Sequence, residues 1–296
     1  MSNTTVNLRR KIYSAGDLQS VVRTMKALAA SNIGQYEKSV AALGDYYRTV
    51  ELGLGICFRE NGSASLITEK KRQTDANTIG AIVFGSDQGL VGSFNDVVAD
   101  FAMKTLSAQP GKSRVWAVGE RVHARLKDTD QQMIKLFPVP NSVKAITPLI
   151  GQILVEIEES RSKGEIVELH LFYNHPVSGA VYAPVNQRLL PLDENWLHER
   201  AGFTWPSKNL PEIIGGHTLT LRALISEYLF VSLFRACAES LASENASRLA
   251  AMQRADKNID ELLVDLNSSF NRLRQSSIHE ELFDVISGSE ALNVED

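Results

Sequence analysis

The sequence predicts an α/β fold class extended by a long two-helix coiled coil, in which the two ends of the chain pair with each other. Two observations lead to this prediction. Both ends of the 296-residue chain lack proline and repeat apolar residues at helical spacing. The middle instead alternates short apolar runs with amphipathic stretches, as small α/β domains do. The first proline is Pro110 and the last is Pro211, so neither terminal helix contains this helix breaker.

The N-terminal helix is expected over residues 1–60. Its apolar positions recur on average about every 3.5 residues, which is the period of a coiled-coil seam rather than of a solitary helix. Charged and polar side chains fill the other faces. The expected seam positions are Leu8, Ile12, Ala15, Leu18, Val22, Met25, Ala29, Ile33, Tyr36, Val40, Leu43, Tyr47, Val50 and Leu54.

The C-terminal helix is expected within residues 216–296 and repeats the same period. We expect it to begin near Thr218 and to run to Ile286, with Gly288 as its stop signal. At 1.5 Å per residue this is roughly 100 Å of helix. The stretch 243–245 predicts one polar layer. The expected seam positions are Leu224, Tyr228, Val231, Phe234, Ala238, Leu241, Ala246, Leu249, Met252, Ala255, Ile259, Leu263, Leu266, Phe270 and Leu273.

The middle of the chain divides into a linker at 61–77, the α/β domain at 78–190 and a proline-rich connector at 191–215. Pro184 predicts that the last strand of the domain lies at an edge of the sheet. Pro148 suits the first turn of a helix. The expected strands are 79–84, 115–118, 133–137, 166–173 and 181–190, and the expected helices are 95–106, 120–126 and 147–161.

Composition excludes several classes of protein. A formal net charge of -4 gives no support for a nucleic-acid partner. No stretch reaches the roughly 18 uninterrupted apolar residues that indicate a membrane-spanning helix. No apolar segment follows Arg9, Arg10 and Lys11, as a secretory signal would require. Cys57 and Cys237 suit a reducing compartment, and a bridge between them stays open only if their helices adjoin.

The glycine-containing loop SDQGLVGSFN, residues 86–95, sits between an expected strand and an expected helix, where phosphate-binding loops occur. It lacks both the GxxxxGK[ST] and the GxGxxG arrangement, and no lysine lies between Lys71 and Lys104. A tight turn or a contact loop is therefore the favoured interpretation, and phosphate binding is the alternative.

The remaining candidate groups are weak. His170 and His175 are five residues apart, which fits no helical metal pair, and the other histidines are scattered. No metal, cofactor or catalytic constellation is expected. Glu239, Glu244 and Arg248 follow one another at intervals of five and four. We interpret them as a solvated helix face with one weak ion pair.

Two C-terminal runs, ESLASENASRLAAMQRADKNIDELL at 239–263 and LNSSFNRLRQSSIHEELFDVISGSEAL at 266–292, resemble the gamma subunit of F-type ATP synthases. That family has an ES-ASE--AR--AM core, an N--RQ--IT-E segment and an EI--GA-AL ending. The run LRRKIYSAGDLQSVVRTMKALAAS at 8–31 resembles the family's first helix, and the loop at 86–95 resembles its SDRGLCGG-N motif. The resemblance spans the whole chain.

The resemblance implies an antiparallel, left-handed coiled coil with the α/β domain at its base. The longer C-terminal helix would protrude into a threefold ring of catalytic subunits. The chain would be a rotor without a catalytic site, coupling ion translocation to ATP synthesis or hydrolysis. Expected partners are catalytic and non-catalytic head subunits, an epsilon-type subunit and a membrane ring of ion-carrying subunits. The absence of a transit peptide suggests the cytoplasmic face of a prokaryotic plasma membrane.

The resemblance also implies a set of partner-contact residues. Arg274 and Gln275 match the family's RQ pair, and Met25 matches the methionine of the first helix. His279 stands where the family has threonine, and Gln88 where it usually has arginine; these departures suggest a divergent branch of the family. The expected coupling residues are Met25, Lys26, Gln88, Arg274, Gln275 and His279.

Two other classes of function remain open at this stage. A static coiled-coil adaptor with an α/β interaction domain would explain the periodicity but not the C-terminal motifs. A small α/β enzyme with helical arms would require a catalytic constellation, and none is found.

Overall fold

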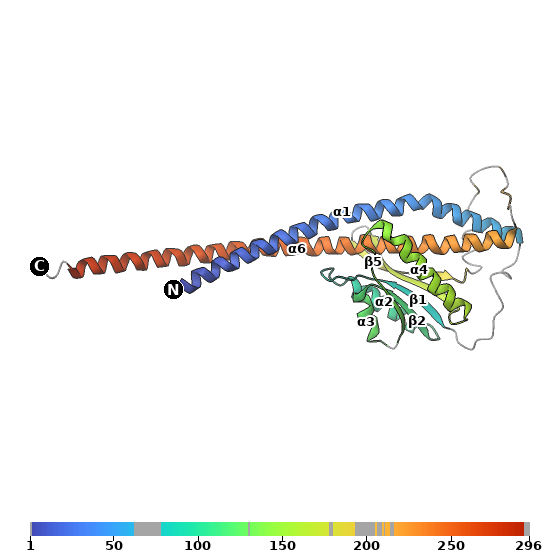
Figure 1. The fold of residues 1–296 in the computed structure, drawn as a ribbon, viewed down its shortest axis with the longest axis horizontal. Helices are drawn as coiled ribbons and strands as arrows, with labels where there is room; N and C mark the ends of the chain where they lie inside the picture. Colours follow the sequence, from blue (N-terminus) through green and yellow to red (C-terminus); the bar gives the residue numbers. More distant parts are fainter. Residues whose placement is uncertain are drawn as a thin grey trace. The chain divides into compact units, whose positions relative to one another are not determined.

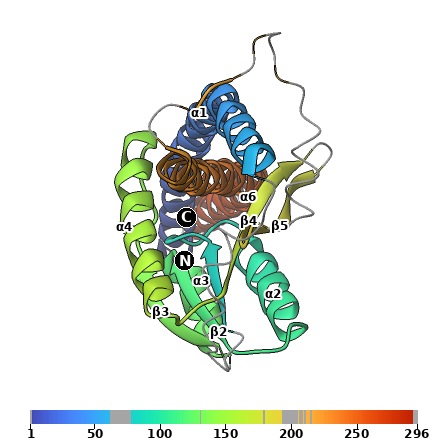
Figure 2. The same ribbon diagram turned by 90° about the vertical axis from the view of Figure 1, so that its right-hand side faces the viewer.

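The computed structural model describes residues 2–61, 78–129, 131–177, 180–192, 205, 209, 211–213 and 216–292. The expected linker at 61–77, apart from its first residue, and most of the connector at 191–215 lie outside these residues. The helices and strands, labelled in Figures 1 and 2, are α1 (Ser2–Asn61), β1 (Ile79–Phe84), α2 (Phe94–Ser107), β2 (Ser113–Val118), α3 (Glu120–Lys127), β3 (Gln132–Phe137), α4 (Val143–Ser162), β4 (Glu168–Val177), β5 (Ala180–Leu190) and α6 (His217–Leu292).

The chain forms two compact units, and both long helices contribute to each of them. The coil unit comprises Met1–Ala29 and Leu249–Asp296, and the domain unit comprises Ala30–Arg248. The sheet and the shorter helices belong to the domain unit.

In the coil unit α1 and α6 pair in opposite directions. The guanidinium of Arg9 lies 5.7 Å from the centre of the Phe270 ring, and the Gln19 amide bonds the carboxylate of Asp260. Because the residue number falls along α6 as it rises along α1, the pair is antiparallel. Val22, Met252 and Ile259 form the buried apolar cluster between the helices. The predicted pairing of the chain ends is confirmed.

One predicted seam position of α1 is wrong. Leu18 is 55% exposed, whereas Gln19 is only 9% exposed and takes the inward position. The reason is polar, since the Gln19 side-chain amide donates to the carboxylates of both Asp256 and Asp260 on α6. A hydrogen-bonded glutamine therefore replaces the expected leucine between the helices.

The domain unit contains a five-stranded sheet in the order β3-β2-β1-β4-β5. The first four strands are parallel, and β5 runs antiparallel to β4 at the edge, where Pro184 predicted it. All six residues of the central strand β1 are buried. Its continuous apolar run follows from this burial on both faces.

Figure 2 shows α2 and α4 on opposite sides of the sheet, and a core of buried apolar residues lies on each side. On one face α2 and α3 contribute Val98 and Val122. On the other face α4 packs with the α1 and α6 segments of this unit, and Trp116 of β2 shares a core with Ile150 of α4 and Leu233 of α6. The helical pair therefore forms part of the layer that covers the sheet.

Two predicted helix boundaries are wrong. Helix α4 begins at Val143, so Pro148 lies inside the helix rather than in its first turn. Burial of Ile146 explains the earlier start, because this side chain is fully enclosed in the core. Helix α6 continues past Gly288 to Leu292. An internal glycine costs about 1 kcal/mol, which is too little to end a helix of this length.

The two cysteines are free and buried, Cys57 on α1 and Cys237 on α6. Gly53 faces Leu224 across the helical pair, so Cys57 lies near the start of α6 and far from Cys237. The bridge that the sequence left open does not form. Burial raises the pKa of the Cys237 thiol, which keeps it protonated and unreactive.

Gly119, between β2 and α3, packs closely against the backbone of Ser86 at the carboxyl end of β1, and a substitution there tests this contact. Its φ is +117°, and a Cβ there would lie 2.8 Å from the backbone nitrogen of Ser86. We expect Gly119→Ala to lower the free energy of unfolding of the purified chain by about 2 to 3 kcal/mol. Urea unfolding followed by circular dichroism measures this change.

Gly151→Ala is the matched control, because a Cβ at this position in α4 would meet no atom within 4 Å. It should raise the free energy of unfolding by about 0.5 to 1 kcal/mol. Similar shifts for the two variants would show that the backbone at Gly119 is not constrained as described.

Candidate functional site

The loop Ser86–Asn95 follows β1 at the carboxyl ends of the parallel strands, where folds of this type commonly bind ligands. The loop is closed by its own side chains. The Asn95 Oδ1 accepts a hydrogen bond from the Ser86 backbone N–H at 2.9 Å, and the Asn95 amide donates to the Ser86 hydroxyl at 2.8 Å. Ser86 is fully buried. The loop is therefore an internally satisfied turn.

The carboxylate of Asp87 joins the loop to the start of α3 and to the segment between β3 and α4. Its Oδ1 accepts from the backbone N–H of Glu120 at the start of α3, at 3.0 Å, and its Oδ2 accepts from that of Val139 at 2.9 Å. Free amides at a helix start attract anions. Here the Asp87 carboxylate engages one such amide, that of Glu120 at the start of α3, and also the amide of Val139. Together with the closure of the loop by Ser86 and Asn95, this favours the turn interpretation over phosphate binding.

The outer side of the loop presents side chains away from this closed interior. Leu90 is 61% exposed and adopts a φ of +62°, a conformation that is unfavourable for a branched residue. Gln88, one of the expected coupling residues, is also exposed. The Ser247 hydroxyl of α6 donates to the Val91 carbonyl at 2.5 Å, so the loop is fixed to α6 while Gln88 and Leu90 face outward.

The interpretation of Glu239, Glu244 and Arg248 as a solvated face is wrong. The Glu239 and Glu244 side chains are only 5% and 7% exposed, and Arg248 is 13% exposed. Glu244 accepts from Arg248 at 2.7 Å. Burial raises the pKa of the Glu244 carboxyl, although Arg248 acts in the opposite direction. Spacing alone could not reveal that the sheet and α1 cover this part of α6.

Glu239 joins α6 to strand β4. Its Oε2 lies 2.8 Å from Nδ1 of His175, and its Oε1 accepts from Nε of Arg235 at 2.7 Å. Burial, together with the charge and hydrogen bond of Glu239, raises the pKa of the nearby Tyr173 phenol. His175 is thus paired with a carboxylate of the same chain.

The polar layer expected at 243–245 is present. The Asn32 amide of α1 donates to Oδ1 of Asn245 at 3.4 Å, and the Asn245 amide donates to the Leu241 carbonyl at 2.8 Å. Ser243 is also buried. A paired asparagine between two helices fixes their register, because a shift of one turn would leave the amide unsatisfied.

Met25 and Lys26, expected to contact partners, are engaged within the chain. Met25 is half-buried against the apolar cluster of the coil unit. The Lys26 ammonium lies 3.3 Å from Asp256, and Arg23 binds the same carboxylate at 3.1 Å. Desolvation raises the pKa of Asp256, but Arg23 and Lys26 together bring it below the usual value.

Arg274, Gln275 and His279 lie exposed on α6, and among the described residues none of them has a hydrogen bond or ion pair. Arg274 is 22 residues beyond Met252, the residue packed beside Met25. This corresponds to about 33 Å of helix. The structure therefore does not bring the expected coupling residues of α1 and α6 together.

Sequence reasoning expected the end of α6 to protrude but did not identify the exposed apolar side chains that it carries. With Arg9 over Phe270 and α1 beginning at Ser2, the last turns of α6 have no α1 segment beside them. The signal was available, because α6 has 76 residues and α1 only 60. The exposed apolar side chains of this end, 47% to 70% exposed, are Ile278, Leu282, Phe283, Val285 and Ile286.

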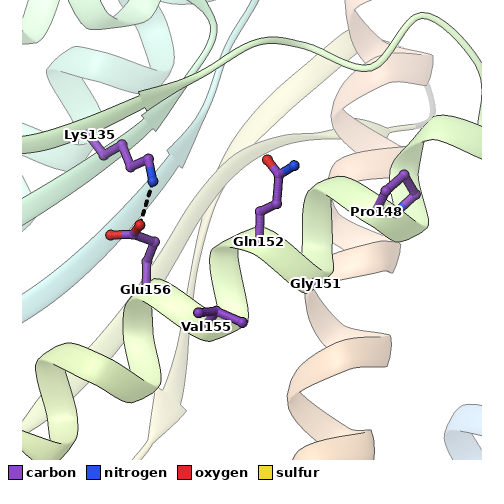
Figure 3. A pocket seen from close by; sticks show the side chains of 6 residues that line it. All are labelled: Lys135, Pro148, Gly151, Gln152, Val155 and Glu156. Atoms are coloured by element: carbon purple, nitrogen blue, oxygen red, sulfur yellow. Dashed lines mark hydrogen bonds and ion pairs between the residues drawn. The ribbon is translucent and has the colours of Figure 1, made fainter.

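A shallow groove between β3 and α4 is a weaker candidate site. Figure 3 shows that the ammonium of Lys135 meets the carboxylate of Glu156 there, beside Gly151, Gln152 and Pro148. The ion pair satisfies the two charges of the groove, which leaves no free charged group for a ligand.

Membrane and metal features were searched in the part of the chain that the structure describes. There, no helix combines the length and apolar character needed to cross a bilayer. Within the same residues, no three His, Cys, Asp or Glu side chains are grouped as metal ligands would be.

Comparison with known proteins places these features in a family. The ATP synthase family model matches residues 4–292. The ATP synthase gamma chain of Clostridium pasteurianum is 28% identical over 300 residues, which covers 97% of this chain and 98% of that one. That of Clavibacter sepedonicus is 27% identical over 291 residues, which covers 96% of each chain.

Solved structures share the fold. The rotor of Euglena gracilis mitochondrial ATP synthase matches with a TM-score of 0.62 and 17% identity, over 94% of this chain and 100% of that one. A chain of the central stalk and c-ring structure of Tetrahymena thermophila mitochondrial ATP synthase matches with a TM-score of 0.56 and 21% identity, over 79% and 99%.

The role of Asp87 in closing the loop can be tested directly. Asp87→Ala removes the acceptor of two backbone amides, one of them at a helix start. We expect it to lower the free energy of unfolding by about 1 to 2 kcal/mol. Hydrogen exchange at the Glu120 and Val139 amides should accelerate with it. Asp128→Ala, an exposed change at the other end of α3, is the control. It should change the free energy of unfolding by no more than about 0.5 kcal/mol and should leave the exchange of both amides unchanged. Unchanged exchange in Asp87→Ala would contradict the bonding described.

Proposed function

This chain belongs to the ATP synthase family, and we propose that it is the central rotor shaft of an F-type enzyme, in the position of the gamma chain. It would couple ion movement through a membrane sector to ATP synthesis or hydrolysis in a catalytic head. The observation that supports this most directly is the end of α6, a single helix that exposes five large apolar side chains. An exposed apolar surface of this kind marks a site of protein contact.

The physics of a rotor explains why a single helix suits this role. A shaft that contacts three equivalent sites equally would shift none of them. Driving one site from mostly open to mostly closed needs on the order of 5 kcal/mol of differential interaction. One helix has no threefold symmetry. It therefore presents different side chains in different directions, and Arg274, Gln275 and Phe283 are all exposed on its surface.

The partners follow from this proposal. The head subunits would surround the end of α6, and the domain unit would meet an epsilon-type subunit and a ring of ion-carrying subunits. Solved relatives of this fold include a central stalk determined together with a c-ring. Gamma chains of bacteria such as Clostridium pasteurianum are similar over nearly their whole length. This similarity supports a peripheral position on the cytoplasmic face of a prokaryotic membrane, held there by the complex.

A rotor is a non-catalytic subunit, so the purified chain should hydrolyse no ATP and bind no nucleotide tightly. The Asp87 carboxylate, which already engages the amides at the sheet edge, provides the structural reason. Calorimetry with Mg·ATP and a phosphate-release assay measure both properties. Substantial turnover by the isolated chain would instead support the alternative of an α/β enzyme with helical arms.

The expected contact residues of α6 provide the second test. In the assembled enzyme, Arg274→Ala with Gln275→Ala should lower ATP-driven ion transport several-fold. The midpoint of thermal unfolding should stay unchanged, because both side chains are exposed and unpaired within the described chain. Arg161→Ala, at an exposed ion pair of α4, is the control and should not affect transport. Equal losses of transport and thermal stability would mean that the two residues only stabilise the helix. Unaffected transport would favour a static adaptor.

A further inference from the structure

We propose that Glu239 is a positioning residue for rotation: its buried carboxylate couples the α/β domain to α6 and transmits torque between them. This inference rests on the proposed rotor function and adds the contact through which domain and shaft turn as one body. A rotor must accept torque at the domain and deliver it along a helix, so the two must not slip.

Three elements meet at this carboxylate. Its two oxygens are taken by different donors, His175 of β4 at 2.8 Å and Arg235 of α6 at 2.7 Å. The guanidinium of Arg235 also lies 5.8 Å from the centre of the Tyr47 ring on α1. Glu239 therefore connects the sheet to α6 directly and to α1 through Arg235.

Two further features keep the Glu239 contact in place. The Glu239 side chain is 5% exposed, so water competes little for its oxygens. Tyr173 of β4 adds a hydrogen bond to the same carboxylate, and burial together with Glu239 raises its phenol pKa, so it stays a neutral donor. The charged or titratable groups facing Glu239 are therefore His175 and Tyr173 from β4 and Arg235 from α6.

The neighbouring surface of α6 explains why a directional bond is needed here. Many of the buried residues of α6 near Glu239 are small, among them Ala236, Ala238, Ser240 and Ala242, although Leu241 is also buried. Small side chains interlock weakly, and apolar contact is non-directional, so it resists turning of the helix about its own axis poorly. A hydrogen bond weakens steeply once its angle is lost. The Glu239 contacts therefore fix the rotational position of α6 against the sheet.

A second fixed point lies two turns further along α6. The Ser247 hydroxyl donates to the Val91 carbonyl in the loop Ser86–Asn95, which follows β1 of the same sheet. Two separate polar contacts between one helix and one domain oppose both twisting and sliding. The Glu239 contact is the one that involves ionisable groups on both sides, and we expect its loss to matter more.

The experiment uses the complete ATP synthase containing this chain, in sealed membrane vesicles. It compares ATP hydrolysis with ATP-driven ion uptake for the wild type and for His175→Ala. The half-exposed His175 can be removed with little change to the core. We expect hydrolysis to stay within about twofold of the wild type. The number of ions moved per ATP should fall at least about threefold.

Two further variants separate torque transmission from general stability. His175→Asn places an amide donor near the position of Nδ1 and should restore most of the transport. Lys163→Ala removes an exposed ion pair with Glu159 in the same domain and should not change the ratio of transport to hydrolysis. A merely structural role for His175 would lower both activities together and leave their ratio unchanged.

An unchanged ratio in His175→Ala would overturn the inference. If that variant fails to assemble, Tyr173→Phe removes a single hydroxyl, and it must show a smaller loss of the same kind for the inference to stand. Failure of the proposed function looks different. Wild-type vesicles would then show no ion transport that depends on this chain, before any variant is compared.

Discussion

The pairing of the two ends of the chain is the constraint on which the rest of the structure depends. In the domain unit Tyr47 lies 6.0 Å from Tyr228 between ring centres, and Asn32 meets Asn245. In the coil unit Arg9 meets Phe270. Antiparallel pairing means that α1 ends beside the start of α6. In the chain, the sheet and the shorter helices of the domain unit therefore lie between the end of α1 and the start of α6.

Polar residues between the helices lose their contact with water on folding, which costs free energy that buried apolar residues would not lose. Gln19 bonds two aspartates of α6, Asn32 bonds Asn245, and Glu244 is buried with Arg248. Replacing buried polar pairs with apolar residues often stabilises a protein, so their presence needs another reason. Long apolar seams can slip by a heptad, and such pairs penalise every wrong register. A rotor shaft must place its contact residues at fixed positions along its axis. For such a shaft, a unique register of the two helices is worth a loss of some stability.

Much of the fold could be predicted from local patterns. The apolar run of β1 indicated a strand buried on both faces, Pro184 indicated the edge, and the seam period indicated two long paired helices. What failed depended on distant residues. Gln19 takes the inward position predicted for Leu18 because it bonds aspartates of the other helix. Helix α4 begins earlier than predicted because Ile146 packs into the core. The burial of Glu239 depends on where the sheet lies against α6, which no spacing within the helix records.

The expected coupling residues also differ in how far the sequence alone could describe their surroundings. Arg274, Gln275 and His279 could be selected by resemblance, and the structure places all three on an exposed helix. Lys26 could not be recognised as internally paired, because its partner Asp256 is 230 positions away. The protruding end of α6 was expected, but the exposure of its apolar side chains was not, because the seam positions were assigned without asking which of them α1 is long enough to cover. Pairings between distant segments are the information that local reasoning lacks.

Direct observation of rotation tests the central claim. The head of the assembled enzyme is fixed to a surface, and a probe is attached through Lys127→Cys on the exposed side of α3. Labelling is specific within this chain because Cys57 and Cys237 are both buried. On addition of ATP, the account predicts that the probe turns in one direction in steps of a third of a turn. ATP hydrolysis with a stationary probe would contradict it.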